Sequence, residues 1–398
     1  MTYDLHRPET YVNGAPHDLF TRLRREEPVV FQEMDDEPGY WAVLRHADVV
    51  HVAKHSEIFS ASEGGVVIED LDAASLEQMR DMLLAMDPPR HTAYRRPLAP
   101  EFKARVIGEM EGRIRTITRE ILDRADTLGP DLEFVHDVSA KLPSQVVGEL
   151  MGLPREDWPA IHAMAERNSG GQDPDIADAA DRGGSSVDMA MYAIGFAARR
   201  REMPEQGDIT DLLLGGEFDG KQMTDIDFGR FFVQLVTAGN DTTRTMLSGG
   251  LLALLQHPEQ MAMLRADHSL IPSAVEEILR WANPLHYFRR TALVDTELGG
   301  AAIAAGDKVA MIYTSANRDE DVFTDSQAFD ITRSPNHHLS FGIATHFCLG
   351  VHLARLEGRV FFEEVLDRWS DIELIGEPRH QQSNLNNSLK SLPIRVAG

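Results

Sequence analysis

Apolar residues recur every three or four positions over long stretches of this chain, and short stretches rich in turn residues separate them. This recurrence is the period of an amphipathic helix. It predicts helices over Ala99–Asp126, Val138–Met151, Asp188–Arg201, Asp225–Gln256 and Ser273–Trp281. The segment Gly39–Leu44 is aromatic and β-branched after a Pro-Gly turn, and it therefore predicts a strand.

The stretch Asn168–Ser186 has no such period. It contains Gly170, Gly171, Pro174, Gly183 and Gly184, residue types that favour turns and interrupt helices. We interpret residues 168–186 as a mobile connection.

The run Asp225–Gln256 is the most informative helix. Thr224 can cap its first turn, with Asp227 three positions later in a variant of the capping box, and Pro258 ends it. At about 1.5 Å per residue the helix is roughly 45 Å long, enough to cross a domain, and its apolar faces place it in the core. The polar residues 240–243 in its middle are costly there unless a polar or reactive group lies beside them.

Composition and charge narrow the possible functions. The chain has 398 residues, 42% of them hydrophobic, so it can bury a large core. Its 39 basic and 64 acidic residues give a formal net charge of -25, which repels phosphate backbones, so we expect no nucleic-acid ligand. Because no stretch of about 18 apolar residues occurs and Met1–Phe20 is rich in charge, we expect no membrane anchor and a cytoplasmic location.

Cys348 is the only cysteine, so the chain forms no internal disulfide and no multi-cysteine metal site. The loop from His338 runs through Cys348 into a helical pattern. This places the thiol at or beside a helix N-terminus, where unpaired amides and the helix dipole lower its pKa and favour a metal-binding thiolate. Two alternatives remain open: a nucleophilic cysteine with His346 as its base, and an inert structural loop.

The segment Phe341–Gly350 resembles the haem-binding loop of cytochromes P450. In that family Phe, Gly, a basic residue, Cys and Gly recur at this spacing, and here they are Phe341, Gly342, His346, Cys348 and Gly350. Ala344 departs from the pattern, because the family usually has a second glycine there. If this position has a positive φ, alanine costs about 1 kcal/mol, without putting the ligand in doubt.

Other segments resemble the same family in the family's order. They are Asp87–Arg96, Ala238–Thr242, the pair Glu277 and Arg280, Arg289–Ala292, and Ser315–Phe323, in which Glu320 replaces the usual proline. The resemblance covers the chain from about Tyr40 to Ile394.

The resemblance implies the cytochrome P450 fold, which is mainly α with small β-sheets (α+β). We expect one domain over residues 1–398, with a β-rich N-terminal part and an α-rich body. In the family this fold is a triangular prism that holds haem b between a long distal helix and the cysteine-bearing proximal helix. Residues 168–186 then form a mobile loop over the pocket.

The resemblance also implies roles for individual residues. Asp241 relays protons and Thr242 orders water through its hydroxyl. Apart from the resemblance, the alternative for two adjacent threonines inside a helix is a bond back to the preceding turn, and Thr243 is expected to do only that. Glu277 and Arg280 form a structural pair, since residues three apart on a helix share a face. The residues implied to bind the cofactor are Cys348 as axial iron ligand, His91, Arg95, Arg290 and His346 at the propionates, Phe341, and Ala238 and Gly239 beside the oxygen site.

The implied activity is that of a haem-dependent monooxygenase, which inserts one atom of O2 into a hydrophobic terpenoid, steroid or fatty-acid-like molecule. Electrons come from a separate ferredoxin and an NAD(P)H-dependent ferredoxin reductase, and we expect a monomer. The locally basic segment Asp87–Arg115 suits an acidic partner of this kind. The residues expected to face the substrate are apolar or aromatic: Val66, Val67, Ile68, Val236, Leu285, Tyr287 and Phe288.

Two other functions remain open. A peroxygenase of the same fold uses hydrogen peroxide directly and needs no acid–alcohol pair, whereas Asp241 and Thr242 are present here. A haem-binding sensor would bind carbon monoxide but form no product. Asn386 and Asn387 either touch a polar group of the substrate or only make a turn.

Overall fold

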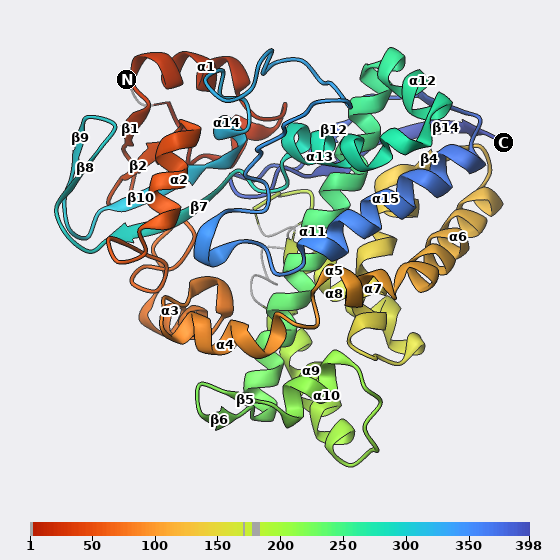
Figure 1. The fold of residues 1–398 in the computed structure, drawn as a ribbon, viewed down its shortest axis with the longest axis horizontal. Helices are drawn as coiled ribbons and strands as arrows, with labels where there is room; N and C mark the ends of the chain where they lie inside the picture. The colour runs from red at the N-terminus through yellow and green to blue at the C-terminus, as the bar shows by residue number, and fades with distance from the viewer. Residues whose placement is uncertain (1–2, 170–171, 177–183) are drawn as a thin grey trace. The chain divides into compact units, whose positions relative to one another are not determined.

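The computed structural model describes residues 3–169, 172–176 and 184–398, and contacts along the chain divide it into two compact units (Figure 1). Unit 1 comprises Met1–Pro89, Gln256–Leu349 and His380–Asn387, and unit 2 comprises Arg90–Leu255, Gly350–Arg379 and Ser388–Gly398. Helices outnumber short strands, which confirms the mainly α class with small β-sheets. None of the described helices combines the length and apolar character needed to cross a membrane. The single domain over residues 1–398 stays a prediction.

A five-stranded sheet organises unit 1, in the order β1-β2-β10-β7-β3. β2 and β10 are parallel, and the other neighbouring strands are antiparallel. All residues of the central strand β10 are buried, which explains its nearly continuous apolar run. The strands of unit 1 are β1 (Val29–Gln32), β2 (Tyr40–Val43), β3 (Phe59–Ser60), β7 (Tyr287–Ala292) and β10 (Lys308–Ile312), with the hairpin β8 (Thr296–Leu298) and β9 (Ala301–Ile303).

Helices of unit 1 pack against this sheet. Val49 and Val52 of α2 join a hydrophobic cluster with Val43, Val309 and Met311 of the sheet. The helices are α1 (His17–Glu26), α2 (His46–Lys54), α3 (Ala73–Arg80), α12 (Pro258–Ala266), α13 (Ile271–Ala282) and α14 (Tyr313–Ala316), with the short turns η1 (Pro8–Tyr11), η2 (Leu83–Ala85), η5 (His268–Leu270) and η6 (Ala344–His346).

Glu320, which replaces the usual proline of the family, anchors α1. Arg24 of α1 is 2% exposed and donates to Glu320 Oε2 at 2.9 Å and to the Arg318 carbonyl at 2.8 Å. Arg25 donates to the other carboxylate oxygen of Glu320 at 2.6 Å. A carboxylate at this position therefore pairs with two arginines of the first helix.

The helix α11 (Asp225–Gln256) has 32 residues and dominates unit 2. Its first turn has the predicted capping arrangement, because Asp227 N donates to Thr224 Oγ1 and Thr224 N donates to Asp227 Oδ2, both at 3.1 Å. The other helices of unit 2 are α4 (Arg90–Leu98), α5 (Ala104–Gly108), α6 (Glu111–Leu128), α7 (Lys141–Leu150), α8 (Trp158–Ser169), α9 (Gly184–Arg201), α10 (Ile209–Gly215) and α15 (Val351–Arg368), with the turns η3 (Val135–Ser139) and η4 (Arg155–Asp157).

Short strands complete unit 2. β4 (Asp131–Glu133), β11 (Asp371–Leu374) and β14 (Pro393–Ala397) form a sheet in the order β11-β14-β4, and β5 (Glu217–Phe218) pairs with β6 (Lys221–Gln222). α15 contacts α6, as Figure 1 shows, and Arg115 of α6 bonds to Glu363 and Glu364 of α15 at 2.6 and 2.7 Å. The remaining strands are β12 (Arg379–His380) and β13 (Leu389–Ser391).

The sequence predicted most elements and misjudged some boundaries. The strand and the last three predicted helices correspond to β2, α9, α11 and α13. The prediction of one helix over Ala99–Asp126 is wrong, because α5 ends at Gly108, a weak helix former, and α6 begins at Glu111. The run Val138–Met151 likewise divides into η3 and α7.

The predicted connection 168–186 is shorter in the structure. Asn168 belongs to α8 and Ser186 belongs to α9, so its two ends are helical. Its central residues 170–171 and 177–183 lie outside the described residues, and the mobile loop stays a prediction.

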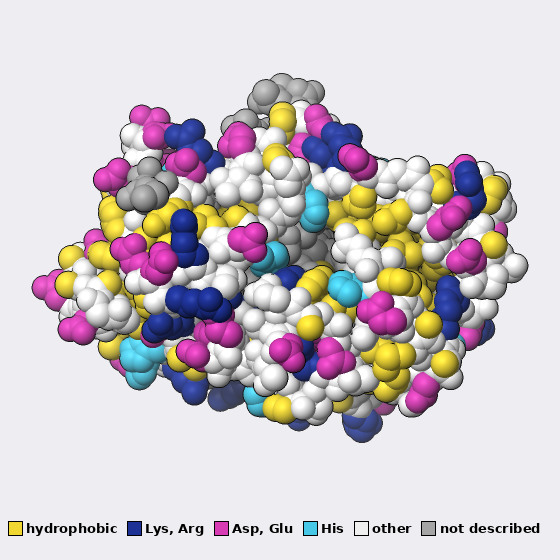
Figure 2. Space-filling model, turned by 90° about the horizontal axis from the view of Figure 1, so that it is seen from above, with side chains coloured by type: hydrophobic (Ala, Val, Ile, Leu, Met, Phe, Trp, Pro, Cys, Tyr) yellow, Lys and Arg dark blue, Asp and Glu magenta, His cyan; other side chains and the backbone are white. Residues whose placement is uncertain are grey.

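Acidic and basic side chains are interspersed on the face of the molecule shown in Figure 2. The net charge of -25 is therefore not gathered into a single acidic patch on that face. Such mixing is typical of a solvated protein surface.

Candidate active site

The cysteine lies in a short loop of unit 1 that folds back on itself. Cys348 N donates to the Phe341 carbonyl at 2.8 Å, and Phe347 N donates to the Ala344 carbonyl at 3.1 Å. Cys348 is half-buried, and α15 begins three positions later at Val351. The predicted position of the thiol just before a helix is therefore confirmed.

Ala344 has a φ of +60°, in the left-handed region. The positive φ considered for this position in the sequence is therefore present, and alanine occupies a conformation that glycine adopts without a steric penalty. The cost is about 1 kcal/mol. Gly342, with a φ of +64°, is the loop's other left-handed residue and matches the family pattern.

Aromatic contacts surround the loop. Phe341 is 9% exposed, and its ring centroid lies 5.8 Å from that of His338 and 6.4 Å from that of Phe347. His346 is half-buried at the end of η6. Unit 1 thus brings Phe341, His346 and Cys348 together on one loop.

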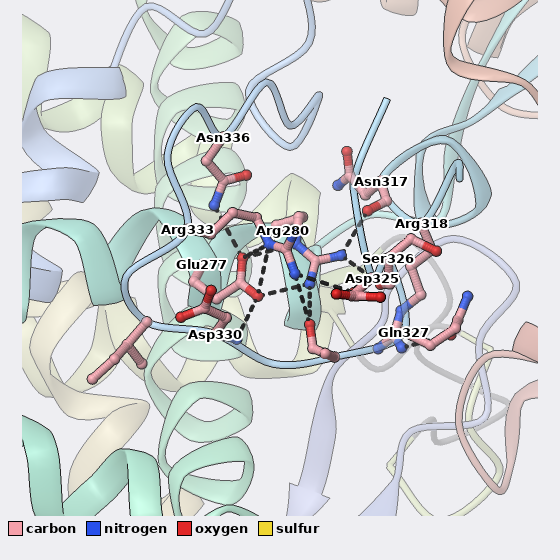
Figure 3. Close-up of polar contacts among 12 residues, drawn as sticks. Glu277, Arg280, Asn317, Arg318, Asp325, Ser326, Gln327, Asp330, Arg333 and Asn336 are labelled. Carbon is pink, nitrogen blue, oxygen red and sulfur yellow. Dashed lines mark hydrogen bonds and ion pairs between the residues drawn. The ribbon is translucent and has the colours of Figure 1, made fainter. Parts of the chain in front are cut away.

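Glu277 and Arg280 form the predicted bridge on α13, and both side chains are fully buried. Arg280 donates to both oxygens of the Glu277 carboxylate, at 2.8 and 2.7 Å. It also donates to the carbonyls of Asn317 and Ser326, which Figure 3 labels, and to that of Ala328. All five N–H groups of the guanidinium therefore have acceptors.

Glu277 is equally saturated. It accepts from Arg333 Nε at 3.1 Å, from Asn336 Nδ2 at 3.0 Å and from Asp330 N at 2.9 Å (Figure 3). A buried carboxylate with these donors stabilises the segment around it and has no lone pair to spare for a ligand. The pair therefore joins α13 to residues 317–336.

Two consecutive arginines of β7 have different partners. Arg289 donates to Asp70 Oδ1 at 3.1 Å and to the Val67 carbonyl at 3.3 Å. Arg290 is 4% exposed and donates to the Arg289 carbonyl at 2.8 Å, and no carboxylate of the described chain forms an ion pair with it. Burial lowers the pKa of Arg290. Since a buried cation without a counter-ion is costly, the position suits an anion supplied by a ligand.

The other two predicted propionate contacts belong to unit 2. His91 and Arg95 lie one turn apart on α4, with His91 2% exposed and Arg95 partly exposed. Arg290 and His346 belong to unit 1.

One face of α11 is left open in a helix that is otherwise largely buried. The residues of this face recur every three or four positions, as one side of a helix requires. Val236, which is fully buried, lies about 200° around the helix from Ala238, so packing accounts for it better than substrate contact. The partly or fully exposed residues of the face are Phe231, Gln234, Leu235, Ala238, Gly239 and Thr242.

The two predicted proton-handling residues are adjacent on α11. Asp241 is 5% exposed, with Oδ1 3.4 Å from Arg244 Nη2. Thr242 Oγ1 donates to the Ala238 carbonyl at 2.6 Å, so its oxygen is left to accept a hydrogen bond. The bond back to the preceding turn, the alternative for the two threonines, is therefore made by Thr242. The expectation for Thr243 is wrong, because its hydroxyl has no hydrogen bond among the described residues.

The predicted substrate contacts fall into two groups. Ile68 and Tyr287 lie in a hydrophobic cluster of unit 1, where Ile68 N donates to the Tyr287 hydroxyl at 3.1 Å, and Val66 is also buried. Val67, Leu285 and Phe288 are partly exposed and are better placed to meet a ligand.

Asn387 makes the turn that was one of its two predicted roles. Its Nδ2 donates to the carbonyls of Ala282 and Asn283 at 2.8 and 3.2 Å. Asn386 N donates to Ser383 Oγ at 3.0 Å in the same turn. Local hydrogen bonds therefore explain both asparagines.

Sequence reasoning missed Arg244. The sequence contained enough to predict this residue, because Arg244 follows Asp241 at the same spacing of three that identified Glu277 and Arg280. It also missed His136 and Glu166, which pair with one another from distant parts of the sequence. No local pattern points to that pair.

Known proteins align with this chain over nearly its whole length. Residues 192–393 match the family model described as cytochrome P450. The steroid C26-monooxygenase of Mycolicibacterium smegmatis is 35% identical over an alignment of 393 positions, which covers 96% of this chain and 91% of that protein. The linalool 8-monooxygenase of Pseudomonas putida is 36% identical over an alignment of 404 positions, which covers 98% of this chain and 98% of that protein.

A solved structure agrees with these relatives. The cytochrome P450 CYP268A2 of Mycobacterium marinum, in complex with pseudoionone, superimposes with a TM-score of 0.88 at 37% sequence identity. The match covers 95% of this chain and 94% of that one.

Proposed function

The chain belongs to the cytochrome P450 family, and from that premise we propose which of its residues perform the family's reaction. It is a monooxygenase of hydrophobic molecules that uses O2 and haem b. When bound, thiolate-ligated haem supplies the iron at which dioxygen is reduced and its O–O bond is cleaved. The chain's own residues hold the cofactor, orient the substrate and move protons.

Cys348 and Arg290 fit the cofactor from unit 1. A thiol before a helix N-terminus ionises readily, and the buried Arg290 has no ion-pair partner in the described chain, as a propionate contact requires. Phe341 belongs to the cysteine loop, where its carbonyl accepts from Cys348 N, and His346 would hold a propionate together with Arg290. His91 and Arg95 would do the same from α4.

The observation that carries the proposed chemistry is the hydrogen bond from Thr242 to the Ala238 carbonyl. Because this bond uses the hydroxyl proton, the Thr242 oxygen is oriented to accept a hydrogen bond over the face that Ala238 and Gly239 leave open. Asp241 supplies protons there. Insertion of one oxygen atom into a C–H bond consumes two electrons and two protons, and the second oxygen atom leaves as water.

The substrate class follows from the relatives. One acts on a steroid, one on linalool, and a third, 37% identical, is named as a methyl-branched lipid omega-hydroxylase from Mycobacterium bovis. These molecules share hydrophobic, methyl-branched carbon skeletons. We therefore propose a terpenoid, a steroid or a branched fatty-acid-like chain, in contact with Val67, Leu285 and Phe288.

A separate ferredoxin and its NAD(P)H-dependent reductase are the proposed electron donors. In the basic segment Asp87–Arg115, which is expected to bind the ferredoxin, some of the arginines already pair with carboxylates of this chain. Arg115 is committed to Glu363 and Glu364, and Arg113 donates to Glu149 at 3.0 Å. Lys103 is exposed and forms no ion pair within the described residues, so it is the better steering charge.

Thr242→Ala tests the proposed function, with Thr243→Ala as the matched control on the same turn. Purified protein should show a strongly red-shifted Soret band in its reduced carbonyl complex, which checks Cys348 ligation. Thr242→Ala should keep that spectrum, consume NAD(P)H and release peroxide in place of product. Unchanged product formation would refute the role of Thr242.

The same variants separate the alternative functions. Turnover with peroxide at undiminished rate in Thr242→Ala, without any electron donor, would favour a peroxygenase. Carbon monoxide binding with no product from any member of a terpenoid, steroid and fatty-acid panel would favour a sensor.

A further inference from the structure

A cavity of 230 Å³ lies within unit 2. Val135 and Ile176 line part of it, and its charged or titratable lining residues are His136, Glu166, Asp175, Arg244, Arg379 and Lys390. A cavity of this size holds several water molecules, and these six side chains supply hydrogen-bond partners for them.

Arg244 connects this cavity to the active-site helix. Its side chain is 6% exposed, and its Nη2 lies 3.4 Å from Asp241 Oδ1. The Nε of Arg244 is buried and has no acceptor in the described chain. Because a buried N–H is rarely left unsatisfied, a cavity water is its natural partner.

Glu166 and His136 form the opposite end of the cluster. Glu166 Oε1 lies 3.8 Å from His136 Nδ1 and, like Arg244 Nε, is buried without a hydrogen-bond partner in the described chain. Glu166 Oε2 lies 3.5 Å from His162 Nε2. The His136 side chain is 60% exposed, so it joins the cavity lining to solvent.

The pKa values agree with this geometry. The neighbouring Glu166 raises the pKa of His136 against the effect of burial. Burial raises the pKa of Glu166, but His136, His162 and Arg244 together lower it to about 2. Glu166 is therefore a permanent carboxylate, whereas His136 has a side chain that can take up and release a proton.

The remaining charges of the cavity are already paired. Lys390 Nζ donates to Asp173 Oδ2 at 2.9 Å and to Asp175 Oδ2 at 2.8 Å, and Arg379 also bonds to Asp175. The negative charge of Glu133, on β4, also raises the pKa of His136. The unfilled hydrogen bonds thus belong to Glu166 and Arg244, on the path from His136 to Asp241.

We propose that this cavity is the route by which protons reach Asp241, with His136 at its solvent end and Arg244 as the positioning residue at its inner end. His136 takes a proton from solvent, a cavity water accepts it, and Asp241 receives it, which returns His136 to its neutral form. Arg244 stays charged throughout. This inference rests on the proposed role of Asp241 and names its proton source.

His136→Gln is the first test, with His55→Gln as the control. His55 is also paired with a glutamate, Glu57, at 2.8 Å, but it lies in unit 1. His136→Gln should lower the product formed per NAD(P)H about tenfold, which is less than the roughly 100-fold or larger loss of a proton donor at the reacting group, because His136 acts through water. It should also raise the solvent isotope effect and flatten the dependence of coupling on pH. The His55→Gln variant should match the wild-type protein.

Arg244→Lys tests the inner end, since it keeps the charge and moves the donors away from Asp241. Coupling should fall with the substrate KM unchanged, and haem content and the unfolding midpoint of each variant show whether it is folded. If either variant is misfolded, Glu166→Gln supplies the same test. Coupling and isotope effects equal to wild type in the folded variants would overturn the inference.

Asp241→Asn, measured alongside, distinguishes two kinds of failure. If Asp241→Asn uncouples the enzyme while His136→Gln behaves like His55→Gln, the cavity route is wrong and the role of Asp241 stands. If Asp241→Asn retains full coupling, the proposed function of Asp241 itself fails.

Discussion

Two helices of this protein each bury an acid and an arginine three positions apart, in very different surroundings. On α13 of unit 1, Glu277 and Arg280 are 0% exposed, 2.7 Å apart, and saturated with hydrogen bonds. On α11 of unit 2, Arg244 Nη2 lies 3.4 Å from Asp241 Oδ1. Arg244 also lines a cavity, and its buried Nε has no hydrogen-bond acceptor among the described residues.

The same spacing therefore has two consequences. A fully bonded buried pair fixes the segments around it and cannot exchange partners without a large loss of free energy. A buried pair with an unfilled bond beside a cavity exchanges partners with water, as proton transfer requires. Departures from full hydrogen bonding are expected at functional sites.

Glu277→Gln should have the largest effect. Neutralising Glu277 leaves Arg280 as an uncompensated buried charge, which costs about 3–5 kcal/mol of the free energy of unfolding. Urea unfolding measures the loss, and the yield of haem-loaded protein should fall with it. Glu276→Gln, on the same helix with a partly exposed carboxylate 3.3 Å from His338, is the control. A loss for Glu277→Gln no larger than for this control would break the comparison.

The Glu166 carboxyl sets a pH dependence of stability in unit 2. Its pKa is lowered from 4.5 to about 2, so its stabilisation is complete above pH 4.5 and is lost as the pH falls through 2. The shift corresponds to at most about 3 kcal/mol. The difference in unfolding free energy between the wild-type protein and Glu166→Gln should therefore shrink from pH 5 to pH 2. A difference independent of pH would contradict the ion pairs assigned to Glu166.

Asp241→Asn should separate activity from stability. The rate of coupled product formation should fall about 100-fold, the lower end of the range for a lost proton donor. The free energy of unfolding should change less than in Glu277→Gln, because Glu166 and cavity water still face Arg244. Product assays and urea unfolding of one preparation check both parts. A stability loss as large as that of Glu277→Gln would mean that both pairs are structural.

The sequence predicted both members of the fully hydrogen-bonded pair, Glu277 and Arg280. Of the pair beside the cavity it predicted Asp241 but not Arg244. Helical period and motif order located α9, α11, α13 and the cysteine loop, because these depend on local spacing. The cavity depends on Arg244, His136 and Glu166, which come from three separate elements. The burial of Val236, Ile68 and Tyr287 was also missed, since the sequence pattern does not say which apolar side chains face the core and which face a ligand.

Ala344→Gly extends the comparison from side chains to the backbone. The cysteine loop of unit 1 has its hydrogen bonds in place, yet Ala344 has a φ of +60°. Glycine should stabilise the protein by about 0.5–1 kcal/mol, because relief of strain exceeds the entropy that glycine adds to the unfolded chain. Gly342→Ala, at a φ of +64°, is the reverse control and should destabilise. Thermal unfolding of both variants measures the difference, and equal shifts in one direction would exclude backbone strain as the cause.

Arg230→Gln completes the series with an exposed pair of the same spacing. Arg230 and Asp227 lie on the first turns of α11, 3.7 Å apart, with side chains 37% and 40% exposed. Water screens such a pair, so its loss should cost about 0.3–0.5 kcal/mol of the free energy of unfolding and leave product coupling unchanged. Urea unfolding and the product assay used for Asp241→Asn check both. A coupling defect here would mean that any acid–arginine pair on α11 affects the reaction through helix stability. A coupling defect in the Arg244 variant would then no longer support a proton route through the cavity.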